Sequence, residues 1–173
     1  MCTGGISVQN LKEYLAFDKV LAVGGTWMCK NEDIRTGAWD KFTVLSREAV
    51  DTMLAFKLAH ICISGANADE AAAMAALLGE MLGKTVCNES GSLFVGERKI
   101  EIMKQPGRGR NGHIAMRCRN VDRAIYHLGL RGVKIDKSSM VTKNEKHTAC
   151  YLNGEIGGFA IHIVEKTPSS ALQ

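Results

Sequence analysis

HICISGANADEA (residues 60–71) is repeated 53 residues further along the chain as HIAMRCRNVDRA (residues 113–124). In both copies a histidine stands nine residues before an aspartate. Each copy is followed by a similar apolar segment, residues 99–103 in the first and residues 160–164 in the second. Because internal repeats set the architecture of a chain, this one predicts two similar units that pair to form one domain.

The repeat also separates the side chains of its strands into two faces. Side chains alternate along a β-strand, so Ile61 and Ile63 point one way and His60 points the other way. The same alternation holds in the other three segments, and each unit therefore has an apolar face for a helix and a mixed face that carries its histidine or glutamate. We expect four residues of the mixed faces to line a shared cleft: His60, Glu101, His113 and His162.

Three imidazoles and one carboxylate suit a divalent transition metal such as zinc, nickel, manganese or iron. Two plainer interpretations stay open: hydrogen-bonded polar residues on strands, and a metal-free cleft for a small molecule. Arg117 shares the face of His113 and is predicted either to contact an anionic ligand or to form a surface ion pair. Cys62 shares the face of His60, but no neighbouring motif activates it, so we interpret it as an inert small side chain.

Length and composition fit an ordinary globular protein. The chain has 173 residues, 46% hydrophobic and 23% charged, with a net charge of +4. This length allows one good-sized domain, or one domain and a piece of another. The densest basic segment, residues 104–110, is a Gly-rich linker that we interpret as a solvated loop. No motif indicates a nucleic-acid partner.

The cysteines and the hydropathy pattern indicate a cytoplasmic protein. The six cysteines are spread along the chain and none forms a CxxC pair, so reduced thiols fit better than a disulfide framework. No apolar run approaches the length of a membrane span, and we see no signal peptide. We therefore expect no membrane partner.

The N-terminal region contains two Gly-Gly pairs, each placed after the end of a predicted strand. Gly4-Gly5 follows the first strand, and Gly24-Gly25 follows the continuous apolar run of residues 20–23. Such a run is typical of a strand buried on both faces of a parallel sheet. Adjacent glycines let backbone N–H groups approach an anion, so the two pairs predict a phosphate cradle at the C-terminal face of a barrel.

Residues 3–7 and 20–27 resemble the last two β/α units of the 2-keto-3-deoxy-6-phosphogluconate / 4-hydroxy-2-oxoglutarate aldolases, and the resemblance covers about the first 50 residues. That family consists of (β/α)8 barrels of carbohydrate metabolism. Its lysine forms a Schiff base with a 2-keto acid, and a glutamate serves as acid and base. The resemblance implies phosphate binding by Gly4, Gly5, Gly24, Gly25 and Thr26.

The Schiff-base lysine and the glutamate of the aldolase family have no counterpart in this sequence. We therefore expect the chain to be part of a longer aldolase that forms a homo-oligomer, and to be inactive as an aldolase alone, because nucleophilic catalysis needs the amine itself. Residues 20–23 should lose most of their burial without further strands. A long helix is predicted over residues 39–58, and its apolar stripe should pack on the rest of the barrel or on the second domain.

The rest of the chain is predicted to fold as βαβββ twice. The predicted elements are a strand at 60–64, a helix at 67–82, strands near 84–88, 92–95 and 98–104, a linker at 106–112, a strand at 113–118, a helix at 121–130, and strands near 133–136, 147–152 and 159–166. This pattern resembles the vicinal-oxygen-chelate superfamily, also named glyoxalase/bleomycin resistance/dioxygenase, over about residues 58–166. The resemblance implies an α+β fold.

The vicinal-oxygen-chelate resemblance also implies which residues would bind a metal ion. Metal-binding members take ligands from the first and last strands of each module, and those positions here are His60, Glu101, His113 and His162. His162 replaces a second glutamate, which can act as the base in glyoxalase-like isomerases. Isomerase chemistry is therefore less well supported than metal binding.

We therefore predict an aldolase-type barrel fragment with a connecting helix (1–57), a vicinal-oxygen-chelate domain (58–166, with modules 58–105 and 112–166) and a flexible tail (167–173). Three functions stay open: the C-terminal portion of a bifunctional aldolase with an appended metal-binding domain, a stand-alone glyoxalase-like metalloenzyme (lyase, isomerase or dioxygenase), and a non-catalytic 2-keto-acid-binding module. A 2-keto acid has adjacent carboxylate and carbonyl oxygens, which suit chelation.

Overall fold

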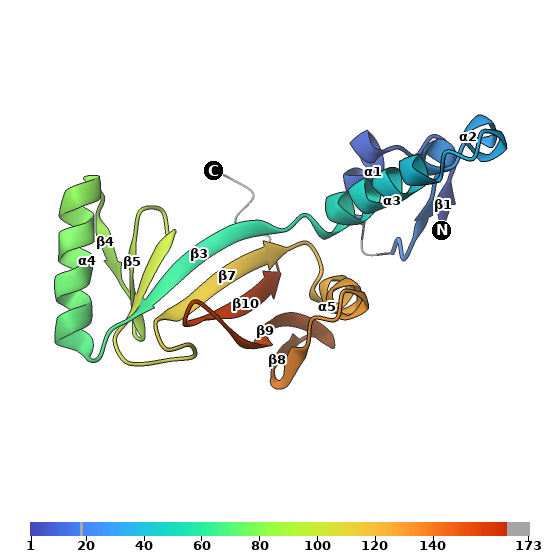
Figure 1. The fold of residues 1–173 in the computed structure, drawn as a ribbon. Coiled ribbons are helices and arrows are strands. Elements are labelled where there is room, and N and C mark those ends of the chain that lie inside the picture. Colours follow the sequence, from blue (N-terminus) through green and yellow to red (C-terminus); the bar gives the residue numbers. More distant parts are fainter. Residues whose placement is uncertain (18, 166–173) are drawn as a thin grey trace. The chain divides into compact units, whose positions relative to one another are not determined.

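The structure is a computed structural model that describes residues 1–17 and 19–165. The chain divides into two compact units, Met1–Ala55 and the part from Phe56 onward (Figure 1). The tail predicted at 167–173 lies outside the described residues. None of the helices in the described part of the chain combines the length and the apolar character needed to cross a bilayer.

The first unit contains two short strands and three α-helices among its described residues. Its elements are β1 (Cys2–Thr3), α1 (Val8–Tyr14), β2 (Val23–Gly24), a 3-10 turn η1 (Thr26–Met28), α2 (Asn31–Arg35) and α3 (Trp39–Leu54). β1 and β2 pair in parallel, with Thr3 opposite Gly24. This register places the two Gly-Gly pairs beside each other at the carboxyl ends of neighbouring strands.

Helix α1 begins where the sequence predicts it, after Ser7, whose backbone N–H donates to Asn10 Oδ1 at 2.8 Å. Leu11 of this helix and the flanking Ile6 and Leu15 form a small buried core, against which two residues of α3 pack: Ala49 and Met53. Two residues of the α3 stripe, Ala49 and Met53, therefore pack inside the first unit, and contact of the stripe with the rest of a barrel or with the second domain stays a prediction. Helix α3 ends at Leu54, whereas the predicted helix extended to residue 58. The helix stops there because Ala55 adopts a left-handed conformation (φ 51°).

The strand predicted at 20–23 is shorter than predicted, and Leu21 lacks burial, as expected without further strands. Only Val23–Gly24 is a strand, and the Leu21 side chain is 86% exposed. Within the described residues, β1 is the one strand that pairs with β2. Two short strands cannot cover both faces of an apolar run, so Leu21 gains no burial.

The second unit repeats one order of elements twice. The first module has β3 (Lys57–Ser64), α4 (Ala68–Leu82), β4 (Val86–Asn88), β5 (Ser92–Val95) and β6 (Ile100–Met103); the second has β7 (Gly112–Cys118), α5 (Val121–Leu130), β8 (Ile135–Lys143), β9 (Lys146–Ile156) and β10 (Phe159–Glu165). The predicted α+β fold of two βαβββ modules is confirmed. Strands β8 and β9 are longer than predicted, because left-handed Asn144 and Glu145 close them into a hairpin.

All the strands of the second unit form one eight-stranded sheet in the order β4-β5-β6-β3-β7-β10-β9-β8 (Figure 1). In each module the first strand lies parallel to the last, β3 beside β6 and β7 beside β10. The modules join where β3 pairs antiparallel with β7, with Cys62 opposite His113. This seam brings the two copies of the repeated histidine strand into direct contact.

Helix capping and core packing follow the repeat as well. The side chains of Asn67 and Asn120, which occupy equivalent positions, accept backbone hydrogen bonds at the starts of α4 and α5. In the first module α4 covers one face of the strands through a buried cluster: Ala71, Ala75, Leu93, Val95 and Ile102. Because Ile102 is on the helix side, the adjacent Glu101 points to the opposite face.

Candidate metal centre

The sheet register brings the four predicted polar residues to one face on neighbouring strands. Glu101 and His113 both pair with Cys62, from opposite sides of β3. His60 and His162 both pair with Ala115, from opposite sides of β7. Each module therefore contributes two side chains, one from its first strand and one from its last.

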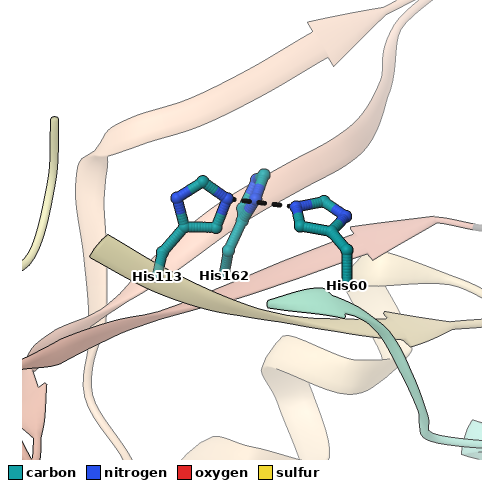
Figure 2. A group of neighbouring side chains, drawn as sticks. All are labelled: His60, His113 and His162. Atoms are coloured by element: carbon teal, nitrogen blue, oxygen red, sulfur yellow. Dashed lines mark hydrogen bonds between the residues drawn. The ribbon is translucent and has the colours of Figure 1, made fainter. Parts of the chain in front are cut away.

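Three donor atoms lie in direct contact. His60 Nε2 is 3.1 Å from His113 Nε2 and 3.1 Å from Glu101 Oε2, and His113 Nε2 is 3.6 Å from Glu101 Oε2. His162 stands beside them, and a ring nitrogen of each of the three histidines lies within 4.8 Å of those of the other two (Figure 2). The structure thus gathers all four predicted residues, three of them tightly.

These separations fit a shared metal ion. Zinc–nitrogen bonds of about 2.0–2.1 Å in a tetrahedron place the donor atoms roughly 3.3 Å apart. The cluster also has unmet hydrogen-bonding capacity, because Nδ1 of both His113 and His162 is buried without a partner among the described residues. Because His113 faces the cluster through Nε2, its Nδ1 would need a separate partner, and the donor spacing is the observation that favours a bound ion.

The protonation states of the clustered side chains also suit metal binding. Burial alone raises the pKa of Glu101, but hydrogen bonds from His60 and Ser92 outweigh it and hold that pKa at about 2. Burial lowers the pKa of His113, and it lowers the pKa of His162 to about 4. Near neutral pH the cluster therefore offers an ionised Glu101 carboxylate and neutral imidazoles at His113 and His162, the forms in which these groups bind metals.

Ser92 orients the glutamate. Its buried hydroxyl donates to Glu101 Oε1 at 2.6 Å, while Oε2 faces the histidines. The sequence analysis missed Ser92. The available signal was a single polar residue in the otherwise apolar strand Ser92–Val95.

Cys62 lies beside the cluster. Its Sγ is within 4.8 Å of donor atoms of Glu101 and His113, and the residue is 0% exposed. Burial, with the charge of Glu101, raises the pKa of its thiol to about 12. The thiol is therefore protonated near neutral pH, as expected for the inert side chain predicted from the sequence.

Two further residues complete this face, and the sequence analysis missed both roles. Tyr151 stacks on His162 with ring centroids 4.3 Å apart and an interplanar angle of 4°. Arg108, interpreted from the sequence as part of a solvated loop, has its Cζ 5.0 Å from the Tyr151 ring centroid. It also forms an ion pair with Asp136 Oδ2 at 2.5 Å. No sequence pattern indicated that a linker arginine returns to the sheet.

Arg117, which was predicted to share the face of His113 and either to contact an anionic ligand or to form a surface ion pair, lies away from the cluster along the strand. Arg117 lies four residues along β7 from His113, which corresponds to about 13 Å of strand. It pairs with Lys57 and Val164 near the other end of the strands. Arg108 is instead the cation on the side of His162.

The predicted phosphate residues lie in the first unit, and a pocket there includes part of the set. Gly5 and Thr26 line a cavity of about 570 Å³ together with Lys30. Gly24 lies beside Thr3 in the strand register. Gly25 leaves room for an aromatic ring, since a Cβ there would fall 1.7 Å from a ring atom of Trp27. Gly4 precedes Gly5 in a left-handed conformation, with φ 84°.

Residues 1–45 match the family model for KDPG and KHG aldolase. The 2-dehydro-3-deoxy-phosphogluconate aldolase of Dickeya dadantii is 48% identical over 48 residues, which cover 28% of this chain and 22% of that protein. The chain thus spans about a fifth of the length of this curated relative. The match confirms the aldolase resemblance of the N-terminal segment, and it ends before the second unit begins.

The second unit has low-identity structural neighbours. A hypothetical protein from Bacillus halodurans is 19% identical with a TM-score of 0.49, and the match covers 65% of this chain and 96% of that one. Methylmalonyl-CoA epimerase from Mycobacterium tuberculosis is 18% identical with a TM-score of 0.48, covering 70% and 94%. The vicinal-oxygen-chelate arrangement of this unit rests on its own doubled βαβββ topology and strand order.

Proposed function

We propose that the second unit is a metal-dependent module for a small 2-keto acid, appended to an aldolase-type segment. Four side chains would hold one divalent ion, zinc, nickel, manganese or iron: His60, Glu101, His113 and His162. When bound, such an ion supplies Lewis-acid polarisation of a carbonyl and a positive charge for two adjacent ligand oxygens.

One observation carries this proposal: three donor atoms on three different strands converge at 3.1–3.6 Å. These separations are close to the roughly 3.3 Å expected between donor atoms around one tetrahedral zinc ion. The donor set also combines nitrogen and oxygen, which suits the four metals named.

The protonation states favour binding over proton abstraction. Burial raises the pKa of Tyr151 and of Cys62, so both groups remain protonated near neutral pH and neither is ready to act as a general base. The pKa of Glu101 is about 2, which makes it a ligand and a very weak base. The Tyr151 hydroxyl can donate a hydrogen bond to a ligand oxygen beside His162.

Metal content decides this proposal. Protein purified without an affinity tag or a chelator is measured by elemental mass spectrometry, and we expect about one zinc, nickel, manganese or iron ion per chain. The double variant His60→Ala/His113→Ala should lose the ion. His127→Ala is the matched control, because His127 lies on helix α5 outside the cluster. If the protein takes up no metal on titration, the proposed metal-dependent function is wrong.

A metalloenzyme of glyoxalase-like type is the second candidate, as a lyase, isomerase or dioxygenase. The observation that favours it is the protonated Tyr151 hydroxyl beside a neutral histidine, which could stabilise negative charge that develops on a reacting oxygen. Turnover of vicinal dicarbonyls or catechols by the metal-loaded protein, lost in Tyr151→Phe, would support an enzyme. Binding of pyruvate without turnover would support the binding module.

For the first unit we propose that the Gly-Gly pairs bind a phosphate group. The support is the parallel register that sets the pairs side by side, and the pocket that includes Gly5, Thr26 and Lys30. A substrate phosphate and a homo-oligomeric aldolase parent follow from the family match as proposals. Titration with inorganic phosphate should shift the amide resonance of Gly5, and Lys30→Ala should weaken binding several-fold; an unmoved Gly5 resonance would contradict this.

A further inference from the structure

A pocket adjoins the candidate metal centre in the second module. It has a volume of about 230 Å³, and its lining includes Arg108, Asp136, Tyr151 and Ala160. Two of these link it to the cluster: Tyr151 stacks on His162, and Ala160 pairs with His113 in the sheet register. The four proposed ligands are not among the residues that line the pocket, so Tyr151 and Ala160 lie between a molecule in the pocket and the cluster.

Arg108 is the cation of this pocket. Its Nη1 donates to Asp136 Oδ2 at 2.5 Å, and its side chain is 47% exposed. A guanidinium has five N–H donors in a planar fork, so one bond to Asp136 leaves donors for a second anion. Among the described residues, Asp136 is the ion-pair partner seen for this arginine.

Asp136 holds Arg108 in place before any ligand arrives. The backbone N–H and the hydroxyl of Ser138 both donate to Asp136 Oδ1, at 2.9 and 2.6 Å, while Oδ2 faces Arg108. The other acidic residue of the pocket, Glu155, accepts from the backbone N–H of Arg110 at 3.2 Å. The guanidinium is thus pre-positioned, which lowers the entropic cost of ordering it around a ligand.

We propose that Arg108 binds a second anionic group of the ligand held at the cluster, so the ligand class is a 2-keto acid with a carboxylate or phosphate at its far end. This inference rests on the proposed metal-dependent function of the same face. The 2-keto end would face the histidines, and the far end would reach the guanidinium past the Tyr151 ring.

The spacing suits such a ligand. Arg108 Cζ lies 5.0 Å from the Tyr151 ring centroid, which in turn lies 4.3 Å from the His162 ring centroid. These two contacts to one ring set an upper limit of about 9 Å on the distance between the Arg108 guanidinium and the His162 ring. A 2-keto acid without a second charged group would occupy the cluster and leave the arginine paired with Asp136 alone.

The first module offers a matched control. Arg98 stacks on Phe94 with its Cζ 3.9 Å from the ring centroid, and it forms an ion pair with Glu89. Phe94 pairs with Glu101 as Tyr151 pairs with His162, so the two arginine–aromatic stacks occupy equivalent places. Arg98→Gln therefore removes a similar side chain with a similar ion pair from the other side of the centre.

The experiment uses the full chain loaded with one equivalent of Mn²⁺ and measures affinity by calorimetry. 2-Oxoglutarate is compared with 2-oxopentanoate, which has the same carbon chain without the second carboxylate. We expect the dicarboxylate to bind roughly 10- to 100-fold more tightly, as expected for a hydrogen bond to a charged group. Arg108→Gln should abolish this preference without changing the affinity for Mn²⁺ or 2-oxopentanoate, and Arg98→Gln should preserve it.

A phosphate at the far end is tested by the pair 2-keto-3-deoxy-6-phosphogluconate and 2-keto-3-deoxygluconate in the same proteins. An Arg108-dependent preference for the charged member of either pair supports the inference and identifies the group. The inference is overturned if Arg108→Gln keeps the full preference for the charged ligand, or if the unmodified chain shows no such preference. In either case the proposed metal site is unaffected. A chain that binds none of zinc, nickel, manganese and iron overturns the proposed function and this inference with it.

Discussion

Replacement of Gly112 by alanine should open the seam between the two modules. Gly112 begins β7 with φ 117°, and a Cβ at this position would lie 2.1 Å from the carbonyl oxygen of Cys62 and 2.8 Å from its carbonyl carbon. Both are backbone atoms of the facing strand β3, so no rotamer change relieves the clash. The two strands must separate or the turn must rearrange.

The magnitude follows from two costs. A left-handed conformation at a residue with a side chain costs about 1–2 kcal/mol. Overpacking a well-packed region costs about 1–3 kcal/mol more. We therefore expect Gly112→Ala to lower the free energy of unfolding by about 2–5 kcal/mol. Because His113 follows directly in the chain, the shift should also move it away from His60 and weaken metal binding.

Urea unfolding of the metal-free protein, followed by far-UV circular dichroism, measures the change in the free energy of unfolding. Gly129→Ala is the control, because Gly129 lies in helix α5 and a Cβ added there would meet no atom within 4 Å. Alanine should stabilise that helix by about 0.5–1 kcal/mol. If Gly112→Ala costs less than about 1 kcal/mol, the close approach at the seam does not constrain the fold and the reasoning is refuted.

Three further outcomes are expected. The unfolded chain binds a proton at His162 below pH 6.5 and the folded chain only near pH 4, so the free energy of unfolding of the metal-free protein should fall by about 2 kcal/mol between pH 7 and pH 5. Urea titrations test this, and an equally steep fall in His162→Gln would contradict it. Ser92→Ala should weaken metal binding roughly 10-fold in a chelator competition assay by releasing Glu101, whereas the exposed Ser90→Ala should not; equal affinities would remove the orienting role. A thiol reagent at pH 7.5 should modify the exposed cysteines rapidly and the buried ones only after unfolding, and rapid labelling of all of them would contradict the burial. The exposed cysteines are Cys29 and Cys87, and the buried ones are Cys62, Cys118 and Cys150.

The sequence predicted the second unit well because its signals are local and repeated. Alternation in β3 and β7 identified the mixed face that carries the histidines, and the spacing of the repeat implied that the two strands are equivalent. Helix α5 was predicted with its observed bounds, Val121–Leu130. These features depend on the period of apolar residues and on capping, which a single sequence contains directly.

The residues that the sequence analysis missed depend on long-range geometry. Tyr151 reaches His162 because β9 pairs with β10, and Arg108 reaches Asp136 across 28 positions of the chain. Ser92 acts on Glu101 through a cross-strand contact. Alternation assigns a residue such as Arg117 to a face but does not say how far along the sheet it lies, and it says nothing about a linker residue such as Arg108.

The replacement of a carboxylate by His162 changes the electrical balance of the proposed centre. A divalent ion held by two carboxylates is neutralised, whereas one carboxylate and three neutral imidazoles leave a net charge of +1. That residual charge, in a partly buried cleft, should make the loaded protein select anions over neutral diols or ketones. Simple monoanions such as acetate should then compete with the natural ligand, and added salt should lower its affinity.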